Sequence, residues 1–313
     1  MIRSALTRHN HSRPTALQWF EVALAAMWAA AILPSQAQAG HANDAAVAVG
    51  AQYDSTHVYL ASSDMDAFVT SFVATFGGKP SVRLVTNVLP VPSSAQVQMV
   101  LTPVGTVSIF AFTTPIPYPF GEERTGYLVT DMDQALKAAR AAGAEVIVDK
   151  FTDPIGIDSV IQWPGGVKMQ LYWHFTPPSY ASLEAVPDNR VYVSRDQADV
   201  FVHAFVQFSR GRVVMDVQAD AGEIGRRGET YRRIDIESPF GRMRVLVTDG
   251  HLPYPFGREL AGYEVRDLGA ALAKATAAGA KVLAPPFDGR DRRTVIVEFP
   301  GGYIAEIHSS QRH

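Results

Sequence analysis

Apolar positions in the first half of the chain change their spacing in a regular order. Residues 56–61 alternate in the manner of a β-strand. Residues 64–76 then carry apolar side chains at helical spacing (Phe68, Val69, Phe72, Val73 and Phe76), and Ser63 or Asp64 can cap this helix. Three strand-like runs follow, at 82–85, 95–101 and 107–112. This order predicts a βαβββ module.

The same order of spacings returns directly afterwards. Residues 127–129 predict a strand, and residues 131–142 predict a helix that Asp131 caps and Gly143 ends. Strand-like runs follow at 146–148, 159–163 and 168–173. Each half of the chain therefore reads βαβββ–βαβββ, so the whole chain predicts four modules.

An internal repeat relates the two halves. Pro-Tyr-Pro-Phe-Gly at 117–121 returns at 253–257, a shift of 136 residues that also relates Ala-Ala-Gly-Ala at 141–144 to 277–280. Near the start of each half the shift is 133, where His57-Val58-Tyr59 matches Arg190-Val191-Tyr192. A length difference of three residues is expected near the loop at 80–92. We predict a tandem duplication with domains at 53–175 and 187–310, joined by a segment rich in Pro and Ser.

Composition is that of an ordinary globular protein. Of its 313 residues 47% are hydrophobic, and the net charge of −3 gives no electrostatic reason to expect nucleic acid as a partner. The absence of cysteine excludes disulfides, zinc thiolates and thiol nucleophiles. Six arginines crowd one stretch of the second half, which predicts a solvated face or, as the alternative, an anion-binding surface. They are Arg226, Arg227, Arg232, Arg233, Arg242 and Arg244.

The first 39 residues have the pattern of a signal peptide. Arg3, Arg8 and Arg13 precede a mostly apolar stretch at 16–33, and Ala37-Gln38-Ala39 fits a cleavage site before Gly40. This leader lacks an Arg-Arg pair, which favours the general secretory route in a bacterium. Beyond Gly40 no apolar run approaches the ~18 residues of a membrane span. We expect the mature protein in the periplasm or outside the cell.

Two motifs, each present twice, resemble the vicinal-oxygen-chelate superfamily, which includes glyoxalases, bleomycin-resistance proteins and extradiol dioxygenases. One is a strand entering Val-x-Asp-(Leu/Met)-x-x-Ala-Leu, at 129–136 and 265–272, before a helix that ends Ala-Ala-Gly-Ala. The other is a Pro-Gly-Gly turn entering a final strand, at 164–171 and 300–307. The resemblance implies an α+β fold in which two βαβββ modules form a curved sheet around a ligand or metal.

In this superfamily a His, a second ligand and a Glu hold a divalent metal. By resemblance these positions are His57, Arg124 and Gln170 in the first half, and Arg190, Leu260 and Glu306 in the second. Arg and Leu cannot bind a metal ion. A non-standard set of His57, Gln170 and His174 remains for Fe, Mn, Ni or Zn, whereas we favour a polar lining without a metal.

Two functional classes stay open. The first is an enzyme, either a lyase, an isomerase or a ring-cleaving dioxygenase, with His57, Gln170 and Glu306 as catalytic groups. The second is a non-catalytic protein that binds or sequesters a small oxygenated or aromatic molecule. The Pro-Tyr-Pro-Phe-Gly loop is expected to be a structural crossover, or alternatively an aromatic lip over the ligand. Candidate ligand-binding residues are Tyr59, Tyr118, Phe120, Arg124, Tyr172, Arg190, Tyr192, Tyr254 and Phe256.

Overall fold

The first half forms two βαβββ modules in the computed structural model, which describes residues 47–87, 93–116, 121, 125–153 and 155–311. The first module contains β1 (Thr56–Ala61), the 3-10 turn η1 (Ser62–Asp64), α2 (Met65–Phe76), β2 (Lys79–Pro80), β3 (Leu84–Asn87), β4 (Ser94–Thr102) and β5 (Gly105–Phe112). The second contains β6 (Gly126–Leu128), α3 (Met132–Ala141), β7 (Glu145–Thr152), β8 (Gly156–Gln162) and β9 (Lys168–His174).

The second half repeats this order. Its first module contains β10 (Asp188–Ser194), α4 (Ala198–Ser209), β11 (Arg212–Asp220), the 3-10 turn η2 (Ala221–Ile224), β12 (Thr230–Ser238) and β13 (Gly241–Thr248). Its second contains β14 (Leu260–Glu264), α5 (Leu268–Ala277), β15 (Lys281–Asp288), β16 (Arg292–Phe299) and β17 (Tyr303–Ser310). The predicted α+β fold of four βαβββ modules is confirmed.

Modules pair within each half through their first strands. In the second half β10 lies antiparallel to β14, so that both modules form one eight-stranded sheet. In the first half a five-stranded and a four-stranded sheet meet at the same place, where the Gly126 amide donates to the Ser55 carbonyl over 3.2 Å. Within every module the first strand runs parallel to the last.

Strand register locates the length difference between the halves. Thr56 on β1 pairs with Val107, whereas the equivalent Asn189 on β10 pairs with Met243, so the second half is three residues longer between these strands. The longer stretch contains η2. This turn carries Glu223, whose side chain enters the cup of the second half.

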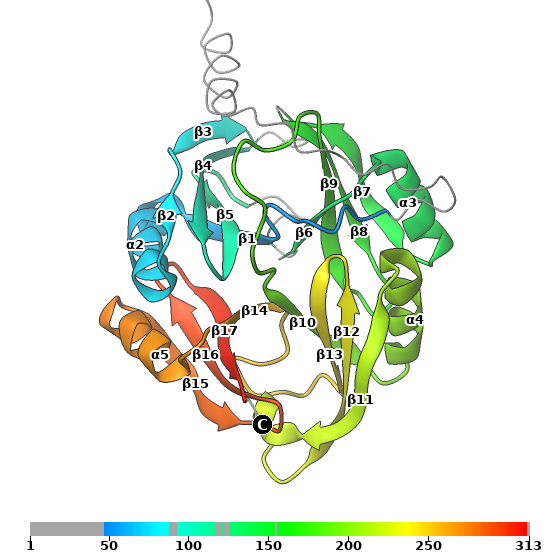
Figure 1. Ribbon diagram of the computed structural model, residues 1–313, viewed down its shortest axis with the longest axis vertical. Helices are drawn as coiled ribbons and strands as arrows, with labels where there is room; N and C mark the ends of the chain where they lie inside the picture. The colour runs from blue at the N-terminus through cyan, green and yellow to red at the C-terminus, as the bar shows by residue number, and fades with distance from the viewer. Residues whose placement is uncertain (1–46, 88–92, 117–120, 122–124, 154, 312–313) are drawn as a thin grey trace, which may run out of the picture.

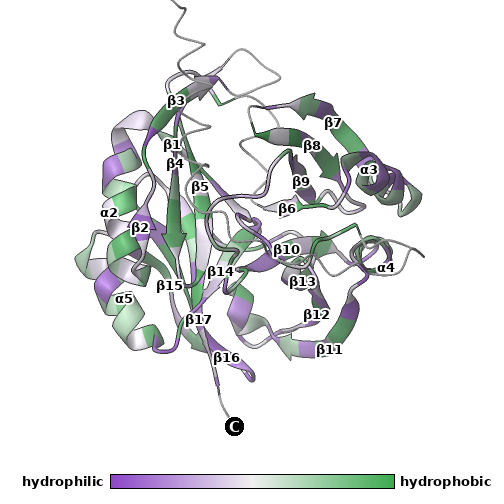
Figure 2. Ribbon diagram, turned by 45° about the horizontal axis from the view of Figure 1, so that its top comes forward, coloured by the Kyte–Doolittle hydropathy of each residue, from purple (hydrophilic) through white to green (hydrophobic). Residues whose placement is uncertain are grey.

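Helices cover the outer faces of the sheets in pairs that join the two halves. Figure 1 shows α2 beside α5 on one side of the molecule and α3 beside α4 on the other, and Figure 2 shows the strands between these pairs. Phe72 of α2 lies 5.4 Å from Tyr263 of β14, measured between ring centroids. Trp163, which follows β8, lies 5.1 Å from Phe208 of α4. Each main apolar core therefore contains residues from both halves.

Local signals in the sequence explain the helix ends. The Asp131 carboxylate accepts a hydrogen bond from the Gln134 amide at the start of α3, and Gly143 follows α3 with a φ of 94°, as predicted. The predicted capping of α2 is wrong, because η1 leads into the helix and the Asp64 side chain makes no capping hydrogen bond. Within the described ranges, no helix is long and apolar enough to cross a membrane.

Candidate functional site

The concave face of the first half encloses a cavity of about 590 Å³. His57 and Tyr59 of β1 line one part of it, and Gln170 and Tyr172 of β9 line another. Residues two apart on a strand share a face, which explains why these pairs point into the same space. Most of the wall is apolar.

The imidazole of His57 lies against Gly126 at the junction of the two sheets. A Cβ atom at position 126 would lie 3.1 Å from His57 Nε2 and 3.5 Å from Tyr172 Cδ1. Gly126 is also the strand partner of Gln170. The missing side chain therefore lets His57 approach the last strand of the partner module.

Asp158 of β8 completes the polar part of the cavity. Gln170 Nε2 donates to Asp158 Oδ1 over 3.0 Å. Burial raises the pKa of Asp158 to about 8, and the nearby Asp153 carboxylate adds to the rise, while Gln170 and His57 oppose it. At pH 7 the Asp158 carboxyl is therefore largely protonated and can donate a hydrogen bond.

Aromatic side chains form one wall beside this polar group. The rings of Tyr59 and Phe110 stack with centroids 5.7 Å apart, and the His57 ring meets Phe110 edge-on at 5.5 Å. Tyr172 is held in place because its hydroxyl donates to the Asp54 carbonyl over 2.6 Å. The Asp54 carboxylate accepts a hydrogen bond from the Ser108 hydroxyl.

His174 and Asp153 lie further along the same wall. The Asp153 carboxylate accepts hydrogen bonds from the backbone amides of Ile155 and Gly156. Burial lowers the pKa of His174 and raises the pKa of Asp153. Both side chains line the cavity, which therefore contains titratable groups in addition to His57 and Asp158.

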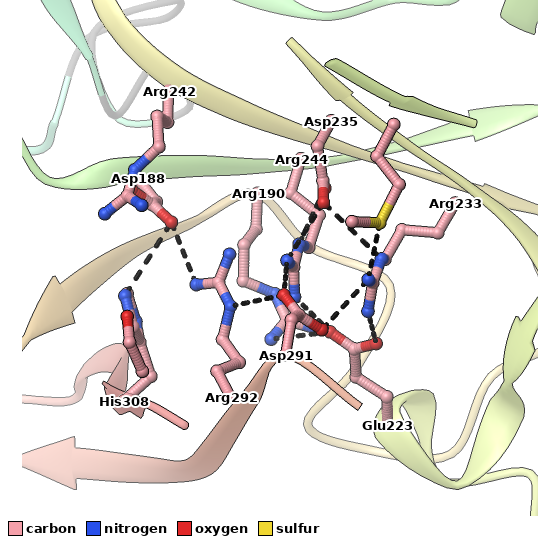
Figure 3. A network of polar contacts seen from close by, with 12 residues as sticks. Asp188, Arg190, Glu223, Arg233, Asp235, Arg242, Arg244, Asp291, Arg292 and His308 are labelled. Atoms are coloured by element: carbon pink, nitrogen blue, oxygen red, sulfur yellow. Dashed lines mark hydrogen bonds and ion pairs between the residues drawn. The ribbon is translucent and has the colours of Figure 1, made fainter. Parts of the chain in front are cut away.

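Charged side chains occupy much of the cup of the second half (Figure 3) and line a pocket of about 200 Å³. Arg190 and Glu306 are fully buried and form an ion pair. Arg244 reaches Glu223 at 3.0 Å, and Arg292 reaches Asp188 at 2.8 Å. We call the whole set the ion-pair network: Arg190, Arg233, Arg242, Arg244 and Arg292 with Asp188, Glu223, Asp235, Asp291 and Glu306.

Pairing in the network has consequences for ionisation. Although burial disfavours its charge, the surrounding guanidinium groups lower the pKa of Glu223 to about 2. His308 contacts Glu306 at 3.0 Å, yet burial and the nearby arginines lower the pKa of its imidazole well below the usual value. The network therefore balances five guanidinium groups with five carboxylates, and His308 stays neutral.

Three of the six arginines in the arginine-rich stretch belong to this network: Arg233, Arg242 and Arg244. Arg233 and Arg244 are buried, so the prediction of a solvated face is wrong for these two. Sequence spacing could not show this, because the carboxylates that pair with them come from η2, β12 and the turn before β16. Arg226 and Arg232 are more exposed, and each is paired with carboxylates.

The aromatic residues predicted to bind a ligand in the second half are either packed in small apolar clusters or exposed. Phe256, in the second Pro-Tyr-Pro-Phe-Gly loop, packs against two small apolar clusters, one of which also contains Tyr192. Tyr254 is 64% exposed, and its hydroxyl lies 3.4 Å from Glu298. In this copy the loop packs as a crossover. The first copy contains Tyr118 and Phe120, which lie outside the described residues, as does Arg124.

Many solved structures have a similar fold. A mutant of 4-hydroxymandelate synthase from Streptomyces coelicolor superposes with a TM-score of 0.58 at 12% identity, over 83% of this chain and 93% of that one. The 2,3-dioxygenase LapB from Pseudomonas sp. KL28 gives 0.52 at 11% identity, over 86% and 94%. The chain has the fold of the vicinal-oxygen-chelate superfamily. Comparison of the sequence with family models and with curated proteins finds no match.

The resemblance predicted a metal centre of a His, a second ligand and a Glu, and the described side chains of neither cup fit it. In the second cup Arg190 and Glu306 neutralise one another. In the first, Gln170 supplies a neutral amide that is engaged with Asp158. Among the described residues no group of three His, Cys, Asp or Glu side chains lies close enough together to hold an ion. A divalent ion needs deprotonated or neutral donors converging on one point, and this set lacks them.

The vicinal-oxygen-chelate fold brings only some of the predicted site residues together. His57, Tyr59, Gln170, Tyr172 and His174 share the first cavity. Glu306, Arg190, Leu260, Tyr192 and Phe256 belong to the second half, where all but Tyr192 and Phe256 are fully or almost fully buried. Asp158 was not predicted. An aspartate within a strand is an unusual choice that could have drawn attention to it.

Proposed function

We propose that the cup of the first half binds a small molecule with an aromatic or otherwise apolar body and a polar substituent. One observation supports this above all: a cavity of about 590 Å³ with a largely apolar wall that also carries polar side chains, among them His57, Gln170 and Asp158. Small-molecule sites commonly have this size and composition. The second cup, where the ion-pair network leaves only a pocket of about 200 Å³, is not proposed as a site.

Each part of the cavity has a role in this binding. Tyr59 and Phe110 stack on an aromatic ring of the ligand. His57, Gln170 and Asp158 form hydrogen bonds with its polar substituent. One structural neighbour, from Sphingomonas wittichii strain RW1, is named as a dioxygenase of 2,2',3-trihydroxybiphenyl, a hydroxylated aromatic molecule. That likeness supports the same class of ligand for this cup.

Calorimetric titration with phenol tests the proposal. We expect saturable binding, at least fivefold weaker in Phe110→Ala, because this ring forms the wall beside His57. Phe175→Ala is the matched control, since Phe175 is 52% exposed and lies outside the cavity wall. The absence of saturable binding up to about 10 mM phenol, a weak affinity even for so small a ligand, contradicts the proposal.

Proton transfer without a metal is a second candidate function. It is favoured by the protonated Asp158 carboxyl in the same cavity as the His57 imidazole, which form an acid and a base in one site. The test is exchange of the α-protons of phenylacetone in D₂O, followed by NMR. His57→Ala and Asp158→Asn should each reduce exchange at least 10-fold if the two residues act together. Exchange no faster than in buffer argues against catalysis of this kind.

We also propose that the protein is exported. The basic start, the apolar stretch at 16–33 and Ala37-Gln38-Ala39 support cleavage after Ala39. Intact-mass measurement of the protein from the periplasmic fraction should give a chain beginning at Gly40. Recovery of the uncleaved chain in the cytoplasm would contradict this.

A further inference from the structure

The two cups differ at every position that carries an arginine of the ion-pair network. By the internal repeat, Arg190, Arg233, Arg242, Arg244 and Arg292 correspond to His57, Val97, Thr106, Ser108 and Gly156. Duplication has thus given one cup five guanidinium groups and left the other with none at these positions. The first cup contains the larger cavity, about 590 Å³ against about 200 Å³ beside the network.

The first cup nevertheless contains carboxyl groups, at positions where the second half has no carboxyl group. Asp54, Asp153 and Asp158 line the cavity. The basic groups that line it, within the described part of the chain, are Lys79 on the exposed strand β2 and the imidazoles of His57 and His174. The buried carboxyl Asp158 is hydrogen-bonded to the neutral amide of Gln170 rather than to a cation.

The aromatic wall of the cavity also favours a positively charged ligand. Tyr59 and Phe110 lie in the same cavity as Asp54 and Asp158. A cation that leaves water is attracted both by a carboxylate and by the face of an aromatic ring. In the second cup the chain's own guanidinium groups satisfy buried carboxylates in this way.

We propose that the first cup binds a small organic cation, an amidinium or guanidinium group carried on an aromatic or apolar body. This inference rests on the proposed small-molecule binding and adds the charge of the ligand. The ligand would take the place that guanidinium groups hold in the second half, where arginines of β12, β13 and β16 pair with the carboxylates. A planar cation with several N–H donors can bind two carboxylates at once.

Binding of a cation is then linked to pH. Asp158 carries a proton at neutral pH in the empty cavity, and a cation beside it favours the carboxylate, so binding releases that proton. Affinity therefore rises with pH until Asp158 is ionised without the ligand. The other described titratable groups that face the cavity include Asp54, Asp153, Lys79 and the imidazoles of His57 and His174, and burial lowers the pKa of His174.

Three ligands of nearly equal shape test the proposal by calorimetry: benzamidine (a cation), benzamide (neutral) and benzoate (an anion). We expect benzamidine to bind at least 10-fold more tightly than benzamide at pH 8, and benzoate to bind most weakly. Between pH 6 and 7.5 the affinity for benzamidine should rise by up to about 10-fold per unit. Asp158→Asn should remove most of this rise and most of the preference for the cation.

Two further variants complete the design. Ser108→Arg copies the guanidinium of Arg244 into the first cup and should abolish benzamidine binding. Asp133→Asn removes a carboxylate from the exposed face of α3 and should change nothing. Circular dichroism checks that each variant is folded, and Asp54→Asn, which should also weaken benzamidine binding, replaces Asp158→Asn if that variant does not fold.

The outcomes separate this inference from the proposed function. If benzamide or benzoate binds as tightly as benzamidine, the cation preference is overturned while binding in the cup stands. Binding of phenol without binding of benzamidine would likewise overturn the cation preference and leave small-molecule binding in the cup standing. If neither phenol nor any of the three ligands binds, both proposals fail.

Discussion

Removal of Arg190 should destabilise the protein strongly. Its side chain is fully buried and pairs with Glu306, which is also fully buried, and lies 3.9 Å from Glu223. Arg190→Met keeps much of the volume and removes the charge. Both carboxylates then remain in the core with fewer counter-charges, because among the described arginines Glu306 keeps only Arg292, at 3.2 Å.

The magnitude follows from the environment of the pair. Breaking a buried ion pair by removing one partner typically costs about 3–5 kcal/mol in the free energy of unfolding. The apolar cores contain residues of both halves, so the loss should affect the unfolding of the whole chain. At about 2 °C per kcal/mol for a chain of this size, Tm should fall by about 6–10 °C.

Urea unfolding followed by circular dichroism measures the effect. In the double variant Arg190→Met with Glu306→Leu, no carboxylate is stranded at position 306, and most of the lost stability should return. Arg212→Met is the matched control, because Arg212 pairs with Glu237 on the surface and its side chain is 76% exposed. A loss below about 1 kcal/mol in Arg190→Met, or additive losses in the double variant, would refute the reasoning.

Three other predictions concern pH, helix ends and stoichiometry. The pKa of Glu223 is about 2 in the folded protein and near 4.5 in the unfolded chain. Its contribution of about 3 kcal/mol to the free energy of unfolding is therefore present above pH 4.5 and is lost as pH falls toward 2. Glu223→Gln should make urea unfolding less dependent on pH between these values, and an unchanged dependence would contradict the prediction. Asp131→Ala and Asp267→Ala each remove a helix cap and should each cost about 1 kcal/mol, measured by thermal unfolding; unequal losses would show that the two repeats do not share this capping interaction. Phenol should saturate at one molecule per chain, because the pocket beside the ion-pair network has only about 200 Å³ and is lined mostly by charged side chains; two equivalent sites would disprove that assignment.

Much of the candidate site was beyond prediction for a physical reason. Strand alternation correctly placed Gln170, Tyr172 and His174 on one face, because that periodicity is local. For Asp158 the sequence offered only the unusual choice of an aspartate within a strand, since its role depends on a hydrogen bond to Gln170 and on burial between two strands. The charge pattern of the second half was equally ambiguous, because arginines on a strand do not reveal where their carboxylate partners lie.

The sequence by itself determined the four modules, the duplication and the ends of α3. These follow from local periodicity, from Asp131 and Gly143, and from the repeat, so they need no information on distant contacts. Only the tertiary structure decided that helices pair between halves and that the two cups differ in content. Ion pairs and burial join residues as far apart as Asp188 and Arg292, and their energies depend on the exclusion of water that packing creates. The same scaffold thus encloses a charged network with a small polar pocket in one half and a larger, mostly apolar cavity in the other.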